Sequence, residues 1–320
     1  MEQRNVGNSG LKVSVVGLGC NNFGGRRIDA DASRKVIHRA LDLGITLFDT
    51  ADTYGNRGES ETILGQCLGD RRKDIVLATK CGLPMDDAGT MKGASRRYIM
   101  SAIDASLKRL KTDWIDLYMI HRPDPFTPIE ETLRTLDDLV RLGKVRYTGC
   151  SKFTAWQVVE AQWTSKHERL NHFIACQDEY NLLRRELEVD LQPAMHAYDL
   201  GLIPYSPLAA GLLTGKYSRN APMPAGARIS REKNQAERWI NDANWDIVER
   251  LTTLCEARGH TLLELTMSWL ASRPLVASII AGATKPEQLD LNVRAVDWRL
   301  TADDLARIDQ VTTRAHSVVD

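Results

Sequence analysis

Four side chains that can hold or move a proton stand at or just after the ends of three short apolar runs. Asp49 closes one run, and Tyr54 follows this carboxylate five residues later. Lys80 closes a second run and His121 closes a third. An acid, a phenol, an amine and an imidazole therefore become available together wherever these three run ends meet.

These four types of side chain suit the reduction of a carbonyl group. A phenol has an ordinary pKa of about 10 and is a reluctant acid at neutral pH, but a nearby ammonium favours the phenolate. We expect Asp49 to orient Lys80, and Lys80 to assist Tyr54 as the proton donor. His121 would hydrogen-bond the substrate oxygen or relay a proton, because imidazole titrates near neutrality. Tyr54 would give its proton as hydride reaches carbon, or accept it in the reverse reaction, and a cofactor must supply the hydride.

Eight short apolar runs, which we predict to be strands, would position this chemistry. Amphipathic stretches at helical spacing lie between most of them, such as Ile99, Ile103, Leu107 and Leu110. Alternating strands and helices form either an open doubly wound sheet or a closed barrel, and the count of eight favours closure. We therefore expect an α/β protein with a (β/α)8 TIM barrel, formed as a single domain by residues 1–320. The runs cover residues 13–19, 45–49, 75–80, 115–121, 145–151, 173–177, 202–206 and 278–282.

Two further segments would close the ends of this barrel. Residues 5–13 read as two short strands about an Asn/Gly-rich turn, which predicts an N-terminal β-hairpin that plugs the bottom. Residues 208–245 are rich in Gly and Pro and read as a long loop after the seventh strand, with Trp239 and Trp245 as its anchors. Because active sites of such barrels lie at the C-terminal strand ends, this loop is a candidate lid.

The composition excludes several classes of partner. The chain has 42 basic and 42 acidic residues, so no broad field favours nucleic acid or an anionic membrane. The N-terminus lacks the pattern of a signal peptide and no apolar run could span a bilayer, so we expect a cytoplasmic protein with a small-molecule substrate. The six cysteines lie far apart without a CxxC pair, which argues against a zinc site or a disulfide framework. No metal is expected, and the oligomeric state is open.

At four places the sequence closely resembles the aldo-keto reductase family. The matching segments are residues 49–55 (DTADTYG), Lys80, residues 116–121 (DLYMIH) and residues 205–208 (YSPL). They occur in the family's order over nearly the whole chain. The resemblance implies a barrel reductase that uses NADPH, with NADH a poorer cofactor, and Tyr54 as general acid.

The resemblance also implies a site for each end of the cofactor. Ser151 and Gln177 stand where the family binds the nicotinamide carboxamide, and Tyr205 stands where a ring stacks under the nicotinamide. Lys152 replaces an asparagine found in many relatives and could reach an anionic group on substrate or cofactor. The further residues expected to bind the cofactor are Gly19, Cys20, Asn21, Asp49 and Ser206.

For the phosphate half, Leu208, Gly211 and Lys216 look like the segment that crosses the pyrophosphate, where glycine permits close approach. Residues 282–288 begin a helix whose N-terminus favours phosphate. In this segment Gly282, Thr284 and the counter-charge Lys285 would hold the 2′-phosphate of NADPH. Gln288 and Asn292 would face the adenine.

Other interpretations stay open. An NADPH-binding, redox-sensing subunit that regulates a partner protein would retain the same barrel and nicotinamide site. A metal-dependent barrel hydrolase would need clustered ligands that this chain does not show. Phe23, Leu83, Met85 and Phe126 are candidate walls of the substrate pocket.

Overall fold

A computed structural model describes residues 1–25, 27–224 and 226–313 of the chain. Eight parallel strands form one sheet in the order β10-β3-β4-β5-β6-β7-β8-β9. The strands are β3 Val16–Gly19, β4 Leu47–Asp49, β5 Val76–Cys81, β6 Ile115–Ile120, β7 Val145–Ser151, β8 Phe173–Gln177, β9 Gly201–Leu202 and β10 Ile279–Gly282.

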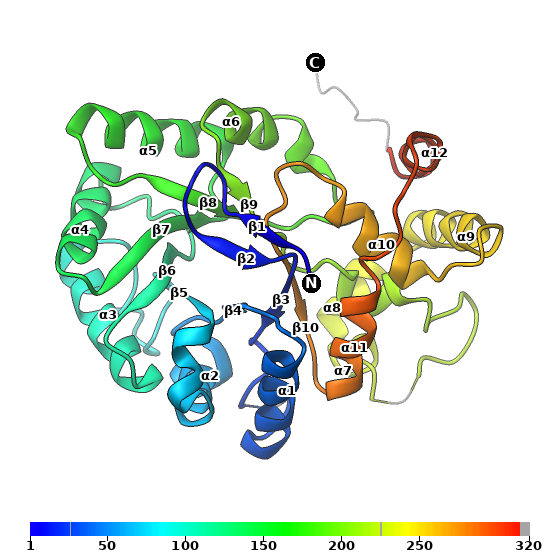
Figure 1. Cartoon of the computed structure of the whole chain (residues 1–320), viewed down its shortest axis with the longest axis horizontal. Coiled ribbons are helices and arrows are strands. Elements are labelled where there is room, and N and C mark those ends of the chain that lie inside the picture. Colours follow the sequence, from blue (N-terminus) through cyan, green and yellow to red (C-terminus); the bar gives the residue numbers. More distant parts are fainter. Residues whose placement is uncertain (26, 225, 314–320) are drawn as a thin grey trace.

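Helices follow the strands and surround the curled sheet (Figure 1). The α-helices are α1 Ala30–Asp42, α2 Tyr54–Cys67, α3 Arg96–Leu110, α4 Ile129–Arg141, α5 Ala155–Glu168, α6 Leu191–Ala197, α7 Arg228–Arg231, α8 Lys233–Trp239, α9 Asp242–Glu256, α10 Leu262–Ala271, α11 Pro286–Arg294 and α12 Ala302–Thr312. Three short 3-10 helices are η1 Gly69–Asp74, η2 Glu186–Glu188 and η3 Ala209–Thr214. The predicted alternation of eight parallel strands with helices is confirmed.

Backbone hydrogen bonds also run between the segments that carry the two edge strands. Leu202 forms a parallel bridge with Val276, and the Ile280 N–H donates to the Pro204 carbonyl at 3.2 Å. The architecture is thus a curled parallel sheet that is consistent with a (β/α)8 fold. The predicted strand at residues 202–206 is shorter than expected, because Pro204 has no N–H to give to the ladder.

The N-terminal segment forms two paired antiparallel strands, as its Asn/Gly-rich turn predicts. β1 Gln3–Asn5 and β2 Lys12–Ser14 are antiparallel, and the run predicted at 13–19 is divided between β2 and β3. Figure 1 shows this pair over the middle of the curled sheet. Val6 and Val13 are fully buried in a cluster with side chains of the sheet, among them Leu117.

The segment predicted as one long loop is more ordered than expected. It contains η3, α7 and α8, and Trp245 already belongs to α9. Trp239 and Trp245 are both buried, as anchors of this segment would be. The glycines and prolines of the segment interrupt helices rather than prevent them, as Gly211 and Gly215 show with positive φ values of 96° and 80°.

Among the described residues, no helix is both long enough and apolar enough to cross a membrane.

Candidate active site

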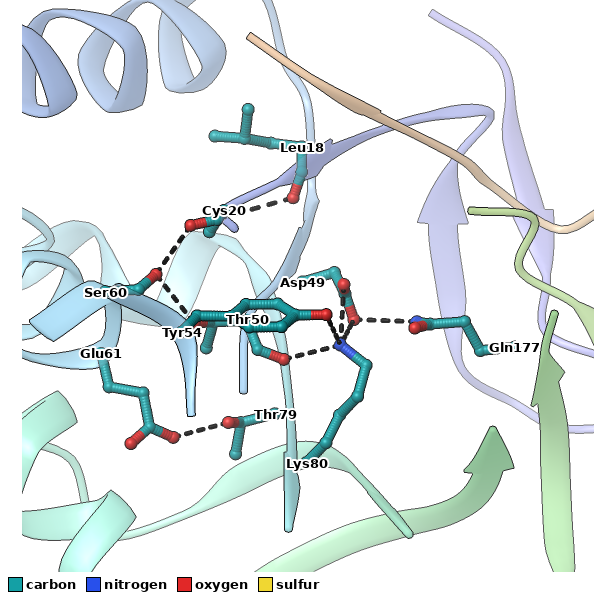
Figure 2. Close-up of polar contacts among 10 residues, drawn as sticks. All are labelled: Leu18, Cys20, Asp49, Thr50, Tyr54, Ser60, Glu61, Thr79, Lys80 and Gln177. Carbon is teal, nitrogen blue, oxygen red and sulfur yellow. Dashed lines mark hydrogen bonds and ion pairs between the residues drawn. The ribbon is translucent and has the colours of Figure 1, made fainter. Parts of the chain in front are cut away.

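A buried ion pair joins the ends of β4 and β5. The Nζ of Lys80 lies 2.8 and 2.9 Å from the two carboxylate oxygens of Asp49 and 2.7 Å from the Thr50 carbonyl. The same Nζ lies 3.5 Å from the Tyr54 hydroxyl, at the outer limit of a hydrogen bond. Figure 2 shows the amine between the carboxylate and the phenol. Asp49, Tyr54 and Lys80 are therefore brought together as their strand ends predict.

The ion pair sets the charge of the amine. Burial acts to lower the pKa of Lys80, but Asp49 and then Tyr54 outweigh it, so the pKa is raised and Lys80 remains an ammonium. For Tyr54, burial raises the pKa, and the charge of Lys80 offsets only part of that effect. We expected the ammonium to make the phenol more acidic; it acts in that direction, but burial dominates.

His121 follows β6 and faces Tyr54. Its backbone N–H donates to the Cys81 carbonyl at 2.8 Å, and its ring lies 5.7 Å from the Tyr54 ring at an interplanar angle of 80°. Burial, followed by the charges of Lys80 and Lys152, lowers the pKa of His121 to about 2. The expectation that His121 titrates near neutrality is therefore wrong. It stands as a neutral imidazole, and its Nδ1 has no hydrogen-bond partner among the described residues.

An unusual backbone conformation at the start of α2 positions Tyr54. Residues 55–58 all have positive φ, and a Cβ on Gly55 would lie 2.3 Å from the Phe23 carbonyl oxygen. Glycine is therefore required at position 55. Ser60 then fixes the helix, because its hydroxyl donates to the Cys20 carbonyl at 2.8 Å and lies 2.9 Å from the Thr50 hydroxyl (Figure 2).

A pocket of about 460 Å³ opens over these groups, and Asp49, Tyr54 and His121 line it. Lys80 lies behind them and is fully buried. Most of the residues predicted to bind the cofactor line the same pocket: Gly19, Asn21, Asp49, Ser151, Lys152, Gln177, Tyr205, Ser206, Leu208, Gly211, Lys216, Gly282, Thr284, Gln288 and Asn292.

Cys20 and Lys285 do not line this pocket. Cys20 is fully buried and its thiol donates to the Leu18 carbonyl, with the Sγ 3.6 Å from that oxygen. Lys285 is an exposed residue that precedes α11. Its expected role as a counter-charge to phosphate stays a prediction.

At the end of the pocket near Tyr54, polar groups remain available. The Ser151 hydroxyl is buried without a hydrogen-bond partner among the described residues. The side-chain amide of Gln177 donates to Asp49 at 2.9 Å, which ties it to the ion pair. The ammonium of Lys152 lies 5.3 Å from the centroid of the Tyr205 ring.

The other end of the pocket combines a strained backbone with the amine of Lys216. Ser206, Ala209 and Ala210 have φ values of 52°, 46° and 55°, a conformation that residues other than glycine adopt at a cost. A Cβ on Gly211 would lie 2.8 Å from the Lys216 Nζ, so the glycine makes room for this amine. Burial lowers the pKa of Lys216.

The backbone N–H groups at the start of α11, which we expected to bind phosphate, are capped by a side chain of the same helix. The Gln288 side-chain oxygen accepts hydrogen bonds from the backbone N–H groups of Thr284 and Lys285, at 2.7 and 3.3 Å. These are amides that we expected to meet phosphate. Gln288 caps the helix as well as lining the pocket, and it would have to turn away before an anion could use these donors.

Three arginines and a glutamate of the pocket wall were not among the predicted site residues. Arg27 pairs with Glu232 at 3.1 Å, and Arg228 pairs with the same carboxylate at 3.3 Å; Arg231 lines the pocket beside them. The charged run at residues 231–233 was the sequence signal for this cluster. Nothing in the sequence placed Arg27 opposite it.

The predicted substrate walls lie outside this pocket. Phe23 is fully buried and Phe126 is 91% exposed, while Leu83 and Met85 also do not line it. Among the described residues, no group of three or more His, Cys, Asp or Glu side chains could hold a metal ion, and all six cysteines are free.

Comparison with known proteins gives a consistent result. The model described as "Aldo/keto reductase family" matches residues 15–313. A "Probable voltage-gated potassium channel subunit beta" of Arabidopsis thaliana is 39% identical, over 97% of this chain and 96% of that protein. The "Uncharacterized oxidoreductase YrpG" of Bacillus subtilis is 34% identical over 97% and 96%. The "L-glyceraldehyde 3-phosphate reductase" of Escherichia coli K12 is 34% identical over 97% and 92%.

Proposed function

Because the chain belongs to the aldo/keto reductase family, we propose that it is an NADPH-dependent oxidoreductase that reduces aldehydes or ketones reversibly to alcohols. The observation that carries this proposal is the Lys80 ammonium held between the Asp49 carboxylate and the Tyr54 hydroxyl. This arrangement supplies a proton donor and a fixed positive charge at one point of the pocket. Oxidoreductases among its relatives support the class of reaction.

The pocket fits a nicotinamide cofactor, which supplies hydride when it is bound. Its volume of about 460 Å³ lies within the range of small-molecule sites. The unpartnered Ser151 hydroxyl and the Gln177 side chain could hold the carboxamide, with Tyr205 as a flat surface beside the ring. At the far end, Lys216 could neutralise the pyrophosphate beside Gly211.

The side chains around the reacting carbon would act on the carbonyl oxygen. Tyr54 donates its proton to that oxygen, and Lys80 stabilises the phenolate that remains. His121 is neutral, so it can donate a hydrogen bond to the same oxygen without competing as an acid. In the reverse direction the phenolate accepts the alcohol proton.

A preference for NADPH over NADH would rest on cations of the lid segment. Arg228 and Arg231 line the pocket from α7, and arginine suits the geometry of a phosphate group. Lys285 is exposed at the start of α11 and could add charge there. We assign the 2′-phosphate to this region, with Arg228 and Arg231 as its first partners.

We further propose that the chain is one cytoplasmic barrel domain whose two ends are closed by separate segments. The β1-β2 pair would plug the bottom, as the burial of Val6 and Val13 against the sheet supports. Residues 208–245 would form a lid at the opposite end, supported by the Arg27–Glu232 ion pair across the pocket.

The experiment that tests the proposal combines purified protein, NADPH and a panel of aldehydes and ketones, with NADPH consumption as the readout. We expect carbonyl-dependent oxidation of NADPH, faster than with NADH. No consumption with any carbonyl, together with no binding of NADPH, would contradict the proposal.

A second candidate function is a redox-sensing subunit that regulates a partner protein. Three relatives at 37–39% identity are named as channel beta subunits, which favours this alternative. It predicts tight NADPH binding with slow turnover and a stable partner at purification from the source organism. Fast turnover with no co-purifying protein would favour a carbonyl reductase over a regulatory subunit.

A further inference from the structure

Lys152 has an unusual position at the end of β7. Its φ is 60°, in the left-handed region that a lysine seldom adopts, and its N–H donates to the Gln177 carbonyl at 3.1 Å. This hydrogen bond to the neighbouring strand holds the strained backbone in place. As a result the side chain lines the same pocket as Tyr54 and His121.

The ammonium of Lys152 is not neutralised by an ion pair. Among the described residues, no carboxylate oxygen lies within the 4.0 Å that defines a salt bridge to its Nζ. Arg122 and Lys80 add positive charge nearby, while the opposing carboxylates are Asp178 and Glu179. Glu179 already pairs with Arg238. Burial, followed by the charge of Arg122, lowers the pKa of Lys152.

Asp178 offsets this charge only in part. Asp178 is one carboxylate near two cations, Lys152 and Arg122, and burial raises its pKa to about 6. The field of Lys152 also reaches the reacting groups, because it contributes to the lowered pKa of His121. The positive charge of Lys152 therefore acts on the His121 side of the pocket, whereas at Tyr205 burial and then the carboxylates Glu179 and Asp178 raise the pKa of the phenol.

The hydride donor must lie in this part of the pocket. A carbonyl oxygen that accepts the Tyr54 proton places its carbon beside Tyr54, and hydride transfer needs reacting atoms about 3 to 3.5 Å apart. A nicotinamide ring that meets this condition lies within the field of Lys152. The ring carries a positive charge when oxidised and none when reduced.

We propose that Lys152 makes the site discriminate between the redox states of the nicotinamide, so that the reduced cofactor binds more tightly than the oxidised one. The inference rests on the proposed function, because it requires the nicotinamide to occupy this pocket. The repulsion acts only on the charged ring, whereas the phosphate contacts are the same for both states. Lys152 is thus a specificity-determining residue for the redox state of the cofactor.

The consequence concerns the rate and the direction of turnover. Each reduction would take a proton from Tyr54 to the carbonyl oxygen and hydride from the bound cofactor to the carbonyl carbon, and Lys152 would then face the oxidised, cationic form of the cofactor. The positive charge of Lys152 would slow the hydride transfer and would speed the release of the oxidised cofactor. A site that holds the reduced state selectively also meets the first requirement of a sensor, since a ligand shifts a protein only through differential binding.

The test is a set of binding titrations with NADPH and NADP+, using wild type, Lys152→Met and Lys152→Arg. Two unit charges about 6 Å apart, at an effective dielectric between about 20 and 80, change an affinity by about 3- to 100-fold. We expect the ratio of the Kd for NADP+ to the Kd for NADPH to fall about tenfold in Lys152→Met, within that range. Lys152→Arg keeps the charge and should keep the ratio.

Lys216→Met is the matched control, because it removes a cation at the phosphate end. It should weaken both cofactors alike and leave the ratio unchanged. An unchanged ratio in Lys152→Met, with both cofactors bound, would overturn the inference and leave the proposed function intact. Wild-type protein that binds neither cofactor would instead contradict both. Lys152→Gln gives a second uncharged variant if Lys152→Met unfolds.

Discussion

The Asp49–Lys80 pair supports both the chemistry and the stability of the site. Lys80 is fully buried, so its positive charge depends on the Asp49 carboxylate beside it. Removing one partner of a buried pair leaves the other charge unpaired, which is costly. The same contact that keeps Tyr54 next to an ammonium therefore also makes the fold depend on Lys80.

Lys80→Met should lower the free energy of unfolding by about 3 to 5 kcal/mol, because Asp49 would remain buried without its cation. Urea denaturation measures this change. The matched variant Lys35→Met removes an exposed lysine of α1 and should change stability by less than about 0.5 kcal/mol. Equal stability of Lys80→Met and wild type would refute the structural part of the argument.

His121 predicts how stability responds to acid. Its folded-state pKa of about 2 lies far below the ordinary value of 6.5, so the unfolded chain binds a proton that the folded chain refuses. The contribution of His121 to stability is therefore complete above about pH 6.5 and is lost as the pH falls, by about 2 kcal/mol between pH 7 and pH 5. In His121→Gln this part of the pH dependence should disappear in denaturation curves at the two pH values. The same slope in both proteins would show that His121 protonates in the folded state.

For single residues, the sequence predicted that the four side chains lie close together. It did not predict which of them carry a charge. Asp49, Tyr54, Lys80 and His121 converge because C-terminal ends of parallel strands share one edge. The neutral state of His121 results from burial and from two lysines that are distant in sequence. Which side chains line the pocket, as Gln288 does and Lys285 does not, likewise depends on a side-chain direction that spacing does not encode.

Among the elements, η3 and α7 line the pocket and belong to the segment that we propose as a lid. The Glu232 carboxylate binds Arg27 across the pocket and Arg228 within its own segment. Arg238 of α8 adds a contact to Glu179, after β8. Opening this segment would therefore require these ion pairs to break.

Glu232→Gln should speed the release of NADPH, by about 2- to 30-fold, since its two partly exposed ion pairs contribute only about 0.2 to 1 kcal/mol each. Stopped-flow displacement of bound NADPH measures the rate. Glu237→Gln is the matched control, because its pairing with Lys233 is exposed and lies away from the pocket wall. A lid role is excluded if the two variants release NADPH at the wild-type rate.

The strands were easier to predict than the segments that close the pocket. Apolar runs locate β5 to β8 because strands buried on both faces read as continuous apolar stretches. The short helices α7 and α8 escaped prediction, since one or two turns carry little periodicity. They are held by ion pairs to distant segments, such as that of Arg27 with Glu232.

For the whole molecule, the pocket is lined by residues from β3 to α11. A ligand that contacts so many elements should stabilise them as one unit. With NADPH at about a hundred times its Kd, the free energy of unfolding should rise by about 2.7 kcal/mol. Thermal denaturation should then show one transition that moves upward with NADPH, and less with an equal concentration of NADH. Two transitions, of which NADPH moves only one, would contradict the single-domain proposal.

The most direct measurement compares Tyr54→Phe with wild type in carbonyl-dependent oxidation of NADPH, with NADPH binding measured on the same samples. The variant keeps the ring and removes the hydroxyl beside Lys80. Turnover should fall by about 10²- to 10⁴-fold, with the Kd for NADPH nearly unchanged. Turnover equal to that of wild type would contradict the assignment of Tyr54 as the proton donor.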